Sequence, residues 1–389
     1  MEHSANGRPV DPPGAVGPQA VSLVEPRRLR RAKAAYTTRF VARSIARDSE
    51  GYGVLSGSDV IPRPGDVVMA RVEHIGQHKG IELPDGRRAT LFEGDDVIVA
   101  YGNRYAPDQF EAEVPGDLGP TNLVAAGGVA ASVLSKHASV AVATTLRPVG
   151  LLTDARGVVT LARSAPYRFG PPQAVLEEEE RPFTIGVVGT SMNSGKTTTV
   201  ASIVRGLTAA GLEVAAGKVT GTGAGGDPGL YRDSGAARVL DFTDFGLAST
   251  YLLHLAEVRA VLEALHRELS SDRPDAIVLE IADGLLQAET ARLVCDPAFG
   301  RYVDSVVFTS REAMAALAGT AMLRQHGLNV AAVGGVLTSS PLATREAREA
   351  LDVPVLDLEG LADPSLALSL LPSPGRPLRS TRADAPVAV

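Results

Sequence analysis

The residues best suited to chemistry form a glycine-rich stretch between an apolar run and a predicted helix. It reads Ile185-Gly-Val-Val-Gly-Thr-Ser-Met-Asn-Ser-Gly-Lys-Thr-Thr-Thr199. Backbone N–H groups of such a loop, together with the start of the following helix, cradle phosphate. The lysine reaches the β- and γ-phosphates, and the threonine after it ligates Mg²⁺. We therefore expect a nucleotide-binding phosphate loop made of Gly189, Thr190, Asn193, Ser194, Gly195, Lys196, Thr197 and Thr198.

The spacing of this loop departs from the strict phosphate-loop pattern. Thr190 occupies the place of the first glycine, five residues before Gly195. The alternative is a Gly/Ser turn that opens a helix whose lysine and threonine are only solvated. No Asn/Thr-Lys-x-Asp guanine motif follows, and the loop contains no second lysine. The nucleotide therefore stays open between ATP and GTP.

Two further charged residues follow apolar runs. Lys218 ends one run and enters a glycine-rich loop, and Glu280 ends another. Doubly wound folds place ligand-facing residues at the carboxyl ends of their strands. We therefore expect Lys196, Lys218 and Glu280 to act as catalytic residues. The alternatives are a solvated lysine in a flexible loop and a capping or surface glutamate.

The loop resembles that of dethiobiotin synthetases, which also reads Gly-Thr-x4-Gly-Lys-Thr. Later segments that match are Lys218-Val-Thr-Gly-Thr222-Gly223, Gly229-Leu230-Tyr-Arg-Asp233 with a one-residue shift, and Glu280-Ile-Ala-Asp-Gly284. The resemblance implies that Thr197, Asp233 and Glu280 surround Mg²⁺. It also implies that Lys218 and Thr222 face the γ-phosphate and the substrate.

This resemblance covers residues 183–373. Asp283 stands where the family has glycine, and Thr338-Ser339 stands where the family's asparagine faces adenine. The identity of the substrate and that of the nucleobase therefore stay undetermined. The segment Tyr231-Arg232-Asp233-Ser-Gly-Ala236 is also similar to part of the molybdopterin-guanine dinucleotide accessory GTPases.

Composition narrows the function classes further. The 389 residues carry a formal net charge of −7, and only 4% are aromatic, which argues against nucleic acid as a partner. No apolar stretch is long enough for a membrane span, and we expect a cytoplasmic protein. One cysteine, Cys295, excludes a multi-cysteine metal site, and we expect it to be packed. His74 and His78 lie in a strand-and-turn pattern that disfavours a zinc site.

The pattern predicts an α/β fold, a P-loop NTPase with a mostly parallel doubly wound sheet preceded by a smaller, β-rich, barrel-like domain. In the nucleotide-binding part, Phe183–Val188 is expected as a strand, Lys196–Ala210 as a helix and Val353–Leu356 as the last strand. A Gly/Ala-rich helical stretch is expected near Leu123–Leu134. The predicted divisions are a tail 1–30, a β-rich domain 31–170, a linker 171–182, a nucleotide-binding domain 183–373 and a tail 374–389.

Together these features predict an enzyme that uses Mg²⁺ and ATP or GTP to transfer a phosphoryl group. It would activate a small anionic substrate in a ligase- or kinase-like reaction. A nucleotide-driven switch or accessory NTPase, whose partner docks on the β-rich domain, is the alternative, and a homodimer stays open. The polar and aromatic segment Tyr101–Phe110 is either a substrate loop between the domains or a structural turn.

Overall fold

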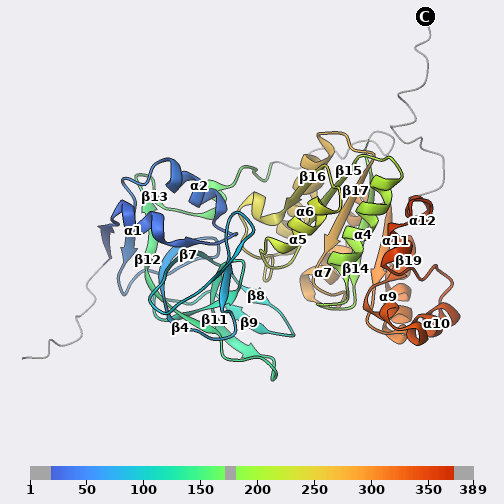
Figure 1. Ribbon diagram of the computed structural model, residues 1–389, viewed down its shortest axis with the longest axis horizontal. Coiled ribbons are helices and arrows are strands. Elements are labelled where there is room, and N and C mark those ends of the chain that lie inside the picture. The colour runs from blue at the N-terminus through green and yellow to red at the C-terminus, as the bar shows by residue number, and fades with distance from the viewer. Residues whose placement is uncertain (1–18, 171–180, 372–389) are drawn as a thin grey trace, which may run out of the picture.

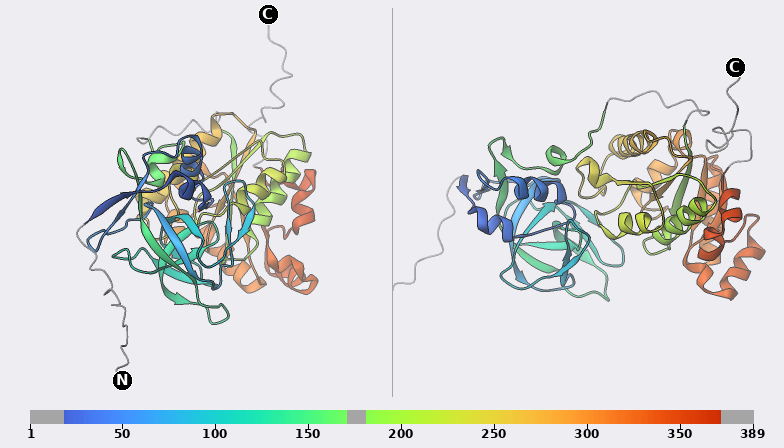
Figure 2. Two further views of the ribbon diagram at one scale, coloured as in Figure 1. Left: turned by 60° about the vertical axis from the view of Figure 1, so that its left-hand side comes forward. Right: turned by 45° about the horizontal axis from the view of Figure 1, so that its top comes forward.

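The computed structural model describes residues 19–170 and 181–371 of the chain. Its β-rich unit and its α/β unit lie side by side along the longest axis (Figure 1), and Figure 2 shows the same arrangement from two further directions. Parts of the predicted tails and linker lie outside the described residues, namely 1–18, 171–180 and 374–389. Within the described part of the chain, no helix has the length and apolarity needed to cross a membrane.

The first described residues belong to the β-rich unit. Strand β1 (Ala20–Leu23) pairs antiparallel with β3 (Gly53–Ser56), and helix α1 (Pro26–Arg31) buries Leu29 in the core. The predicted tail over residues 1–30 is therefore wrong for residues 20–30. The strand pairing, the buried side chains of Val24 and Leu29 and an ion pair between Arg28 and Asp96 hold this segment on the unit.

Five longer strands of this unit pair in a closed ring. In the order β12, β4, β7, β11 and β10, each strand pairs with the next, and β10 pairs back with β12. Their bounds are β4 Val67–His74, β7 Asp96–Tyr101, β10 Thr121–Ala125, β11 Val129–Lys136 and β12 Thr144–Asp154. The smaller elements are β2 Lys33–Ala34, α2 Arg39–Arg47, β5 Gly80–Glu82, β6 Arg88–Thr90, β8 Arg104–Tyr105, β9 Phe110–Glu113, β13 Gly157–Val158 and α3 Leu161–Ser164.

The stretch predicted as helical near Leu123–Leu134 is instead the hairpin of β10 and β11. Gly128 at its turn has a φ of 97°, a conformation that glycine adopts without steric cost. β-branched residues such as Val129 and Val133 fit the pleated surface of a sheet. The glycine pair therefore forms a turn between two strands, and the helix prediction is wrong.

The α/β unit contains a six-stranded parallel sheet in the order β16-β15-β17-β14-β18-β19. The strand bounds are β14 Phe183–Gly189, β15 Val214–Lys218, β16 Arg238–Asp241, β17 Ala276–Ile281, β18 Ser305–Thr309 and β19 Val330–Gly334. The α/β prediction is confirmed, as is the strand over Phe183–Val188. The predicted last strand, Val353–Leu356, is wrong, because only an isolated parallel bridge joins Val333 to Val355.

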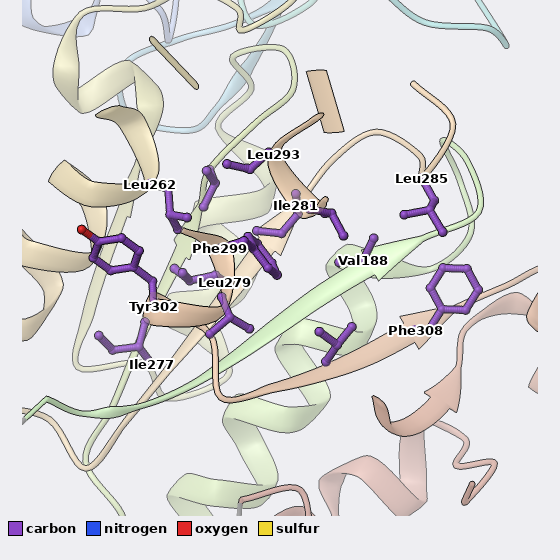
Figure 3. Close-up of a cluster of buried hydrophobic side chains, with 14 of the residues drawn as sticks. Val188, Leu262, Ile277, Leu279, Ile281, Leu285, Leu293, Phe299, Tyr302 and Phe308 are labelled. Carbon is purple, nitrogen blue, oxygen red and sulfur yellow. The ribbon is translucent and has the colours of Figure 1, made fainter. Parts of the chain in front are cut away.

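Helices cover both faces of this sheet. Alternate residues of β17 point into different clusters: Ile277 and Leu279 lie in one, and Val278 lies in the other. Figure 3 shows the first cluster, where side chains of β17 meet those of α6, α7 and α8. Helix bounds are α4 Lys196–Ala209, α5 Gly226–Asp233, α6 Leu255–Ser270, α7 Ala288–Val294, α8 Phe299–Tyr302, α9 Ala313–Gln325, α10 Pro341–Ala350, α11 Leu358–Ala362 and α12 Pro364–Ser369. Two 3₁₀ turns, Phe242–Phe245 and Val336–Ser339, complete the unit.

Candidate functional site

The glycine-rich loop connects the carboxyl end of β14 to the start of α4. Gly195, the residue before the helix, has a φ of 99° and so favours glycine. A Cβ at Gly189 would overlap the hydroxyl of Ser194 and come within 3.0 Å of Cγ of Lys196. The glycines therefore allow the loop to fold tightly over the helix N-terminus, where unpaired backbone N–H groups attract anions.

Polar contacts with neighbouring strands hold the loop in place. The Ser194 hydroxyl lies 2.8 Å from that of Thr309 at the end of β18. The backbone N–H of Thr190 donates to the Thr309 carbonyl at 2.9 Å, and that of Val336 donates to the Ser194 carbonyl at 3.0 Å. Thr190 is thus held by a backbone hydrogen bond, which a threonine can make as well as a glycine can.

Lys196 is buried, and its ammonium turns back over the loop. Nζ donates to the Ser191 carbonyl at 2.8 Å and also to the Asp283 carbonyl. Burial lowers the pKa of Lys196, because a charged amine loses hydration there. Its present partners are carbonyl oxygens, and phosphate oxygens can replace them.

The remaining loop residues have distinct surroundings. Thr198 is exposed, and its hydroxyl donates to the Gly195 carbonyl at 3.0 Å. Asn193 has a φ of 58° and its side chain donates to the carboxylate of Asp108 in the β-rich unit. The loop is therefore in direct contact with both units of the chain.

A second group of charged residues lies at the carboxyl ends of β15 and β17. Lys218 and Glu280 are register partners across these strands, and Nζ of Lys218 lies 3.2 Å from Oε1 of Glu280. Asp227, at the start of α5, forms a further ion pair with Lys218. Burial disfavours the charge of Lys218, but the two carboxylates outweigh it and raise its pKa. The structure thus brings Lys218 and Glu280 together, as the position of each at a strand end predicts.

Tyr231 connects this group to the phosphate loop. Its buried hydroxyl donates to Oε2 of Glu280, and a hydrogen bond also joins it to the Thr197 side chain. Burial and the nearby Glu280 raise the pKa of Tyr231, so it stays a neutral donor. Tyr231 is a site residue that the sequence motifs did not reveal. The available signal was its place in α5, four residues after Asp227 and therefore on the same helix face.

The two remaining predicted site residues, Asp233 and Thr222, differ in their surroundings. Asp233 is exposed on the last turn of α5, and among the described residues no ion pair or hydrogen bond connects its side chain to Thr197. Asp227, on the first turn of the same helix, is the acid that reaches the cluster. Thr222 forms a bridge with Ser249 of the same unit. The glycine-rich loop around Thr222 packs against the β-rich unit, where a Cβ at Gly127 would overlap the Gly223 carbonyl.

The histidines and the cysteine are separate from this site. His78 is buried, and its Nε2 lies 2.9 Å from the Val124 carbonyl. His74 is exposed, and among the described residues no group of three or more His, Cys, Asp or Glu could hold a metal. Cys295 is exposed, so the prediction that it is packed is wrong. Cys295 caps the carboxyl end of helix α7, and its Sγ lies 3.2 Å from Nε2 of His326.

The donor set fits Mg²⁺ bound together with a nucleotide. Mg²⁺ takes one or two protein oxygens and completes its shell with phosphates and waters. The Thr197 hydroxyl and the Glu280 carboxylate are such oxygens, and both contact the hydroxyl of Tyr231. A site that shares its ligands with phosphates does not require three protein carboxylates.

No family model matches this chain, and no curated protein matches it. Among solved structures, the signal recognition particle receptor FtsY from Elizabethkingia anophelis is 18% identical with a TM-score of 0.29, over 50% of this chain and 58% of that one. The chain therefore spans less than two thirds of that receptor.

Two further solved structures show a similar level of likeness. MinD from Pyrococcus horikoshii, complexed with Mg-ADP, is 16% identical with a TM-score of 0.32, over 49% of this chain and 94% of that one. The kinase domain of the Escherichia coli tyrosine kinase ETK is 15% identical with a TM-score of 0.30, over 41% and 68%. The phosphate-loop assignment therefore depends on this chain's own strand, loop and helix.

Proposed function

We propose that this chain is an enzyme that binds Mg²⁺ with ATP or GTP and transfers a phosphoryl group to a small anionic substrate. The observation that supports this most directly is the pair of buried lysines, Lys196 on the phosphate loop and Lys218 at the end of β15. Both interact electrostatically with Glu280 and Asp283. Two cations at one edge of a parallel sheet suit a substrate with several negative charges.

The residues of the site would act mainly by position and charge. Phosphoryl transfer asks for little covalent help from a protein, so catalysis comes from orienting the groups and neutralising charge. Lys196 would hold the phosphates above the loop, and Lys218 would stabilise charge at the transferring group. Asp227 and Glu280 keep Lys218 protonated and fixed in the absence of substrate.

Thr197 and Glu280 are the residues that would hold Mg²⁺. When bound, the ion would neutralise phosphate charge and orient the terminal phosphate. Tyr231 would fix the Glu280 carboxylate by donating a hydrogen bond to one of its oxygens. The other carboxylate oxygen lies 3.2 Å from Nζ of Lys218, so Mg²⁺ would share the Glu280 carboxylate with these two groups.

A nucleotide-driven switch is the second candidate function. It is favoured by the contact between Asn193 of the phosphate loop and Asp108 of the β-rich unit, because a change at the loop would reach the unit on which a partner could dock. An enzyme should release phosphate faster when its acceptor is added. A switch should instead turn over nucleotide slowly in every metabolite pool and respond to a protein partner.

The experiment that tests nucleotide binding compares Lys196→Ala with Lys79→Ala. Lys79 is exposed in the β-rich unit and controls for the loss of one positive charge. Calorimetric titration with Mg-ATP and Mg-GTP should show affinity roughly a hundredfold weaker in Lys196→Ala, since a buried charge-assisted contact is lost. Lys79→Ala should bind as the wild type does. Equal affinity in all three proteins would refute the phosphate-loop assignment.

A further inference from the structure

Arg104 is a buried cation that the proposed mechanism does not use. It lies on β8 of the β-rich unit and is 6% exposed. One terminal nitrogen donates to Oε1 of Gln109 at 2.9 Å. Its Nε is buried and has no hydrogen-bond partner among the described residues.

Such an arrangement is costly without a ligand. A guanidinium has five N–H donors in a fixed plane, and leaving buried donors unpaired costs free energy. Burial lowers the pKa of Arg104 to about 10, and Asp283 is the acid that opposes this shift. Arg104 therefore has one buried donor, its Nε–H, without a partner among the described residues.

Contacts across the interface hold Arg104 against the α/β unit. A Cβ at Gly102 would lie 2.9 Å from that of Ala248, so the backbone before β8 packs closely on the loop that leads to α6. Beyond it, the rings of Tyr105 and Tyr251 are 5.5 Å apart. Asp108 then accepts the hydrogen bond from Asn193 of the phosphate loop.

Asp283 lies within electrostatic reach of the Arg104 guanidinium. This carboxyl group interacts electrostatically with Lys196, Lys218 and Arg104 together. The carbonyl of the same residue accepts the hydrogen bond from Nζ of Lys196. Three cations from two units thus converge on one acid beside the phosphate loop, where the terminal phosphate of a nucleotide would carry the same kind of charge.

We propose that Arg104 binds the terminal phosphate of the bound nucleoside triphosphate, so that the β-rich unit completes the nucleotide site. This inference depends on the proposed function. A phosphate oxygen would pair with the free Nε–H of Arg104, and the phosphate would take over its interaction with Asp283. A planar guanidinium can make two parallel bonds to a phosphate, which an ammonium cannot. A diphosphate lacks the group that Arg104 would reach.

The test compares affinities for a triphosphate and a diphosphate. Mg-ADP and the non-hydrolysable analogue Mg-AMP-PNP, with the guanine counterparts in parallel, are titrated calorimetrically into the wild type, Arg104→Gln and Arg104→Lys. The control is Arg147→Gln, since Arg147 is an exposed arginine of the same unit. We expect Arg104→Gln to lose about tenfold or more of the preference for triphosphate. Its affinity for the diphosphate should stay unchanged, and Arg147→Gln should match the wild type.

Arg104→Lys keeps a cation within reach of Asp283. This variant provides the test if Arg104→Gln does not fold. It should still lose the triphosphate preference several-fold, because it cannot make the paired bonds. An unchanged preference in a folded variant, or an equal loss for both nucleotides, overturns the role of Arg104 while leaving nucleotide binding intact. Failure of the wild type to bind either nucleotide refutes the proposed function, and this inference with it.

Discussion

Replacing Lys218 with methionine separates a structural role of this lysine from a catalytic one. The variant keeps an unbranched side chain only one heavy atom shorter, but it removes the ammonium that pairs with Asp227 and Glu280. At 3.2 Å and an effective dielectric constant of about 20, the attraction to Glu280 alone is about 5 kcal/mol. Breaking a buried ion pair by removing one partner commonly costs about 3–5 kcal/mol. We therefore expect Lys218→Met to lower the free energy of unfolding by about 3 kcal/mol.

The same substitution should also slow turnover. An interaction that strengthens in the transition state affects kcat more than ground-state binding. Loss of one preorganised electrostatic donor typically costs roughly a hundredfold in kcat. Nucleotide affinity should change only a few-fold, because Lys196 and the loop amides remain. Lys218→Arg should not restore turnover fully, since the guanidinium is larger and planar.

A double variant, Lys218→Met with Asp227→Asn, distinguishes the two effects. It removes one of the two uncompensated carboxylates and should recover part of the lost stability. Turnover should stay low, since no cation is restored. Urea unfolding followed by circular dichroism measures stability, and phosphate release in the presence of metabolite pools measures turnover. Recovery of turnover together with stability would make Lys218 a structural residue and favour the switch. A single variant as stable as the wild type would contradict the ion-pair reasoning.

Two further predictions concern pH and domain structure. Burial lowers the pKa of His78 from 6.5 to about 4, so the unfolded chain takes up the proton first. As the pH falls from about 6.5 to 4, the free energy of unfolding should therefore fall by up to about 3 kcal/mol. Urea unfolding at pH 7 and at pH 5 measures this loss of stability, which should be smaller in His78→Gln than in the wild type. An equal loss of stability between pH 7 and pH 5 in the variant and the wild type would contradict the burial argument. A fragment of residues 181–371 should fold and bind Mg-nucleotide, since the fully buried residues of its apolar clusters are its own and only the half-buried Tyr167 comes from outside it. It should be less stable than the full chain because Asp244 loses its ion pair with Arg39, and a fragment unfolded by circular dichroism would show that the units depend on each other.

The strand, glycine-rich loop and helix around Lys196 could be predicted from sequence because their determinants are local. A buried apolar strand, a glycine of left-handed conformation and a helix start directly at Lys196 all lie within one short segment. Lys218 and Glu280 required one further rule, that the carboxyl ends of parallel strands share an edge. Their register pairing in the structure agrees with that rule.

Other parts of the site could not be predicted in this way. The role of Asp233 came from a motif alignment, whereas helical geometry turns that residue to solvent and turns Asp227 and Tyr231 inward. Arg104 reaches the site only because two units pack together, and no local pattern carries that information. The hairpin of β10 and β11 was missed because Gly and Ala are compatible with several structures until strand pairing selects one.

The contact between Gly127 and Gly223 determines how motion can pass between the units. Backbone meets backbone there, with no side chain in between whose rotamer could absorb a shift. Gly223 lies five residues after Lys218, and Gly127 lies in the turn between β10 and β11. If a nucleotide draws Lys218 away from Asp227 and the shift extends along the loop to Gly223, it would reach Gly127 of the hairpin without a change of rotamer in between.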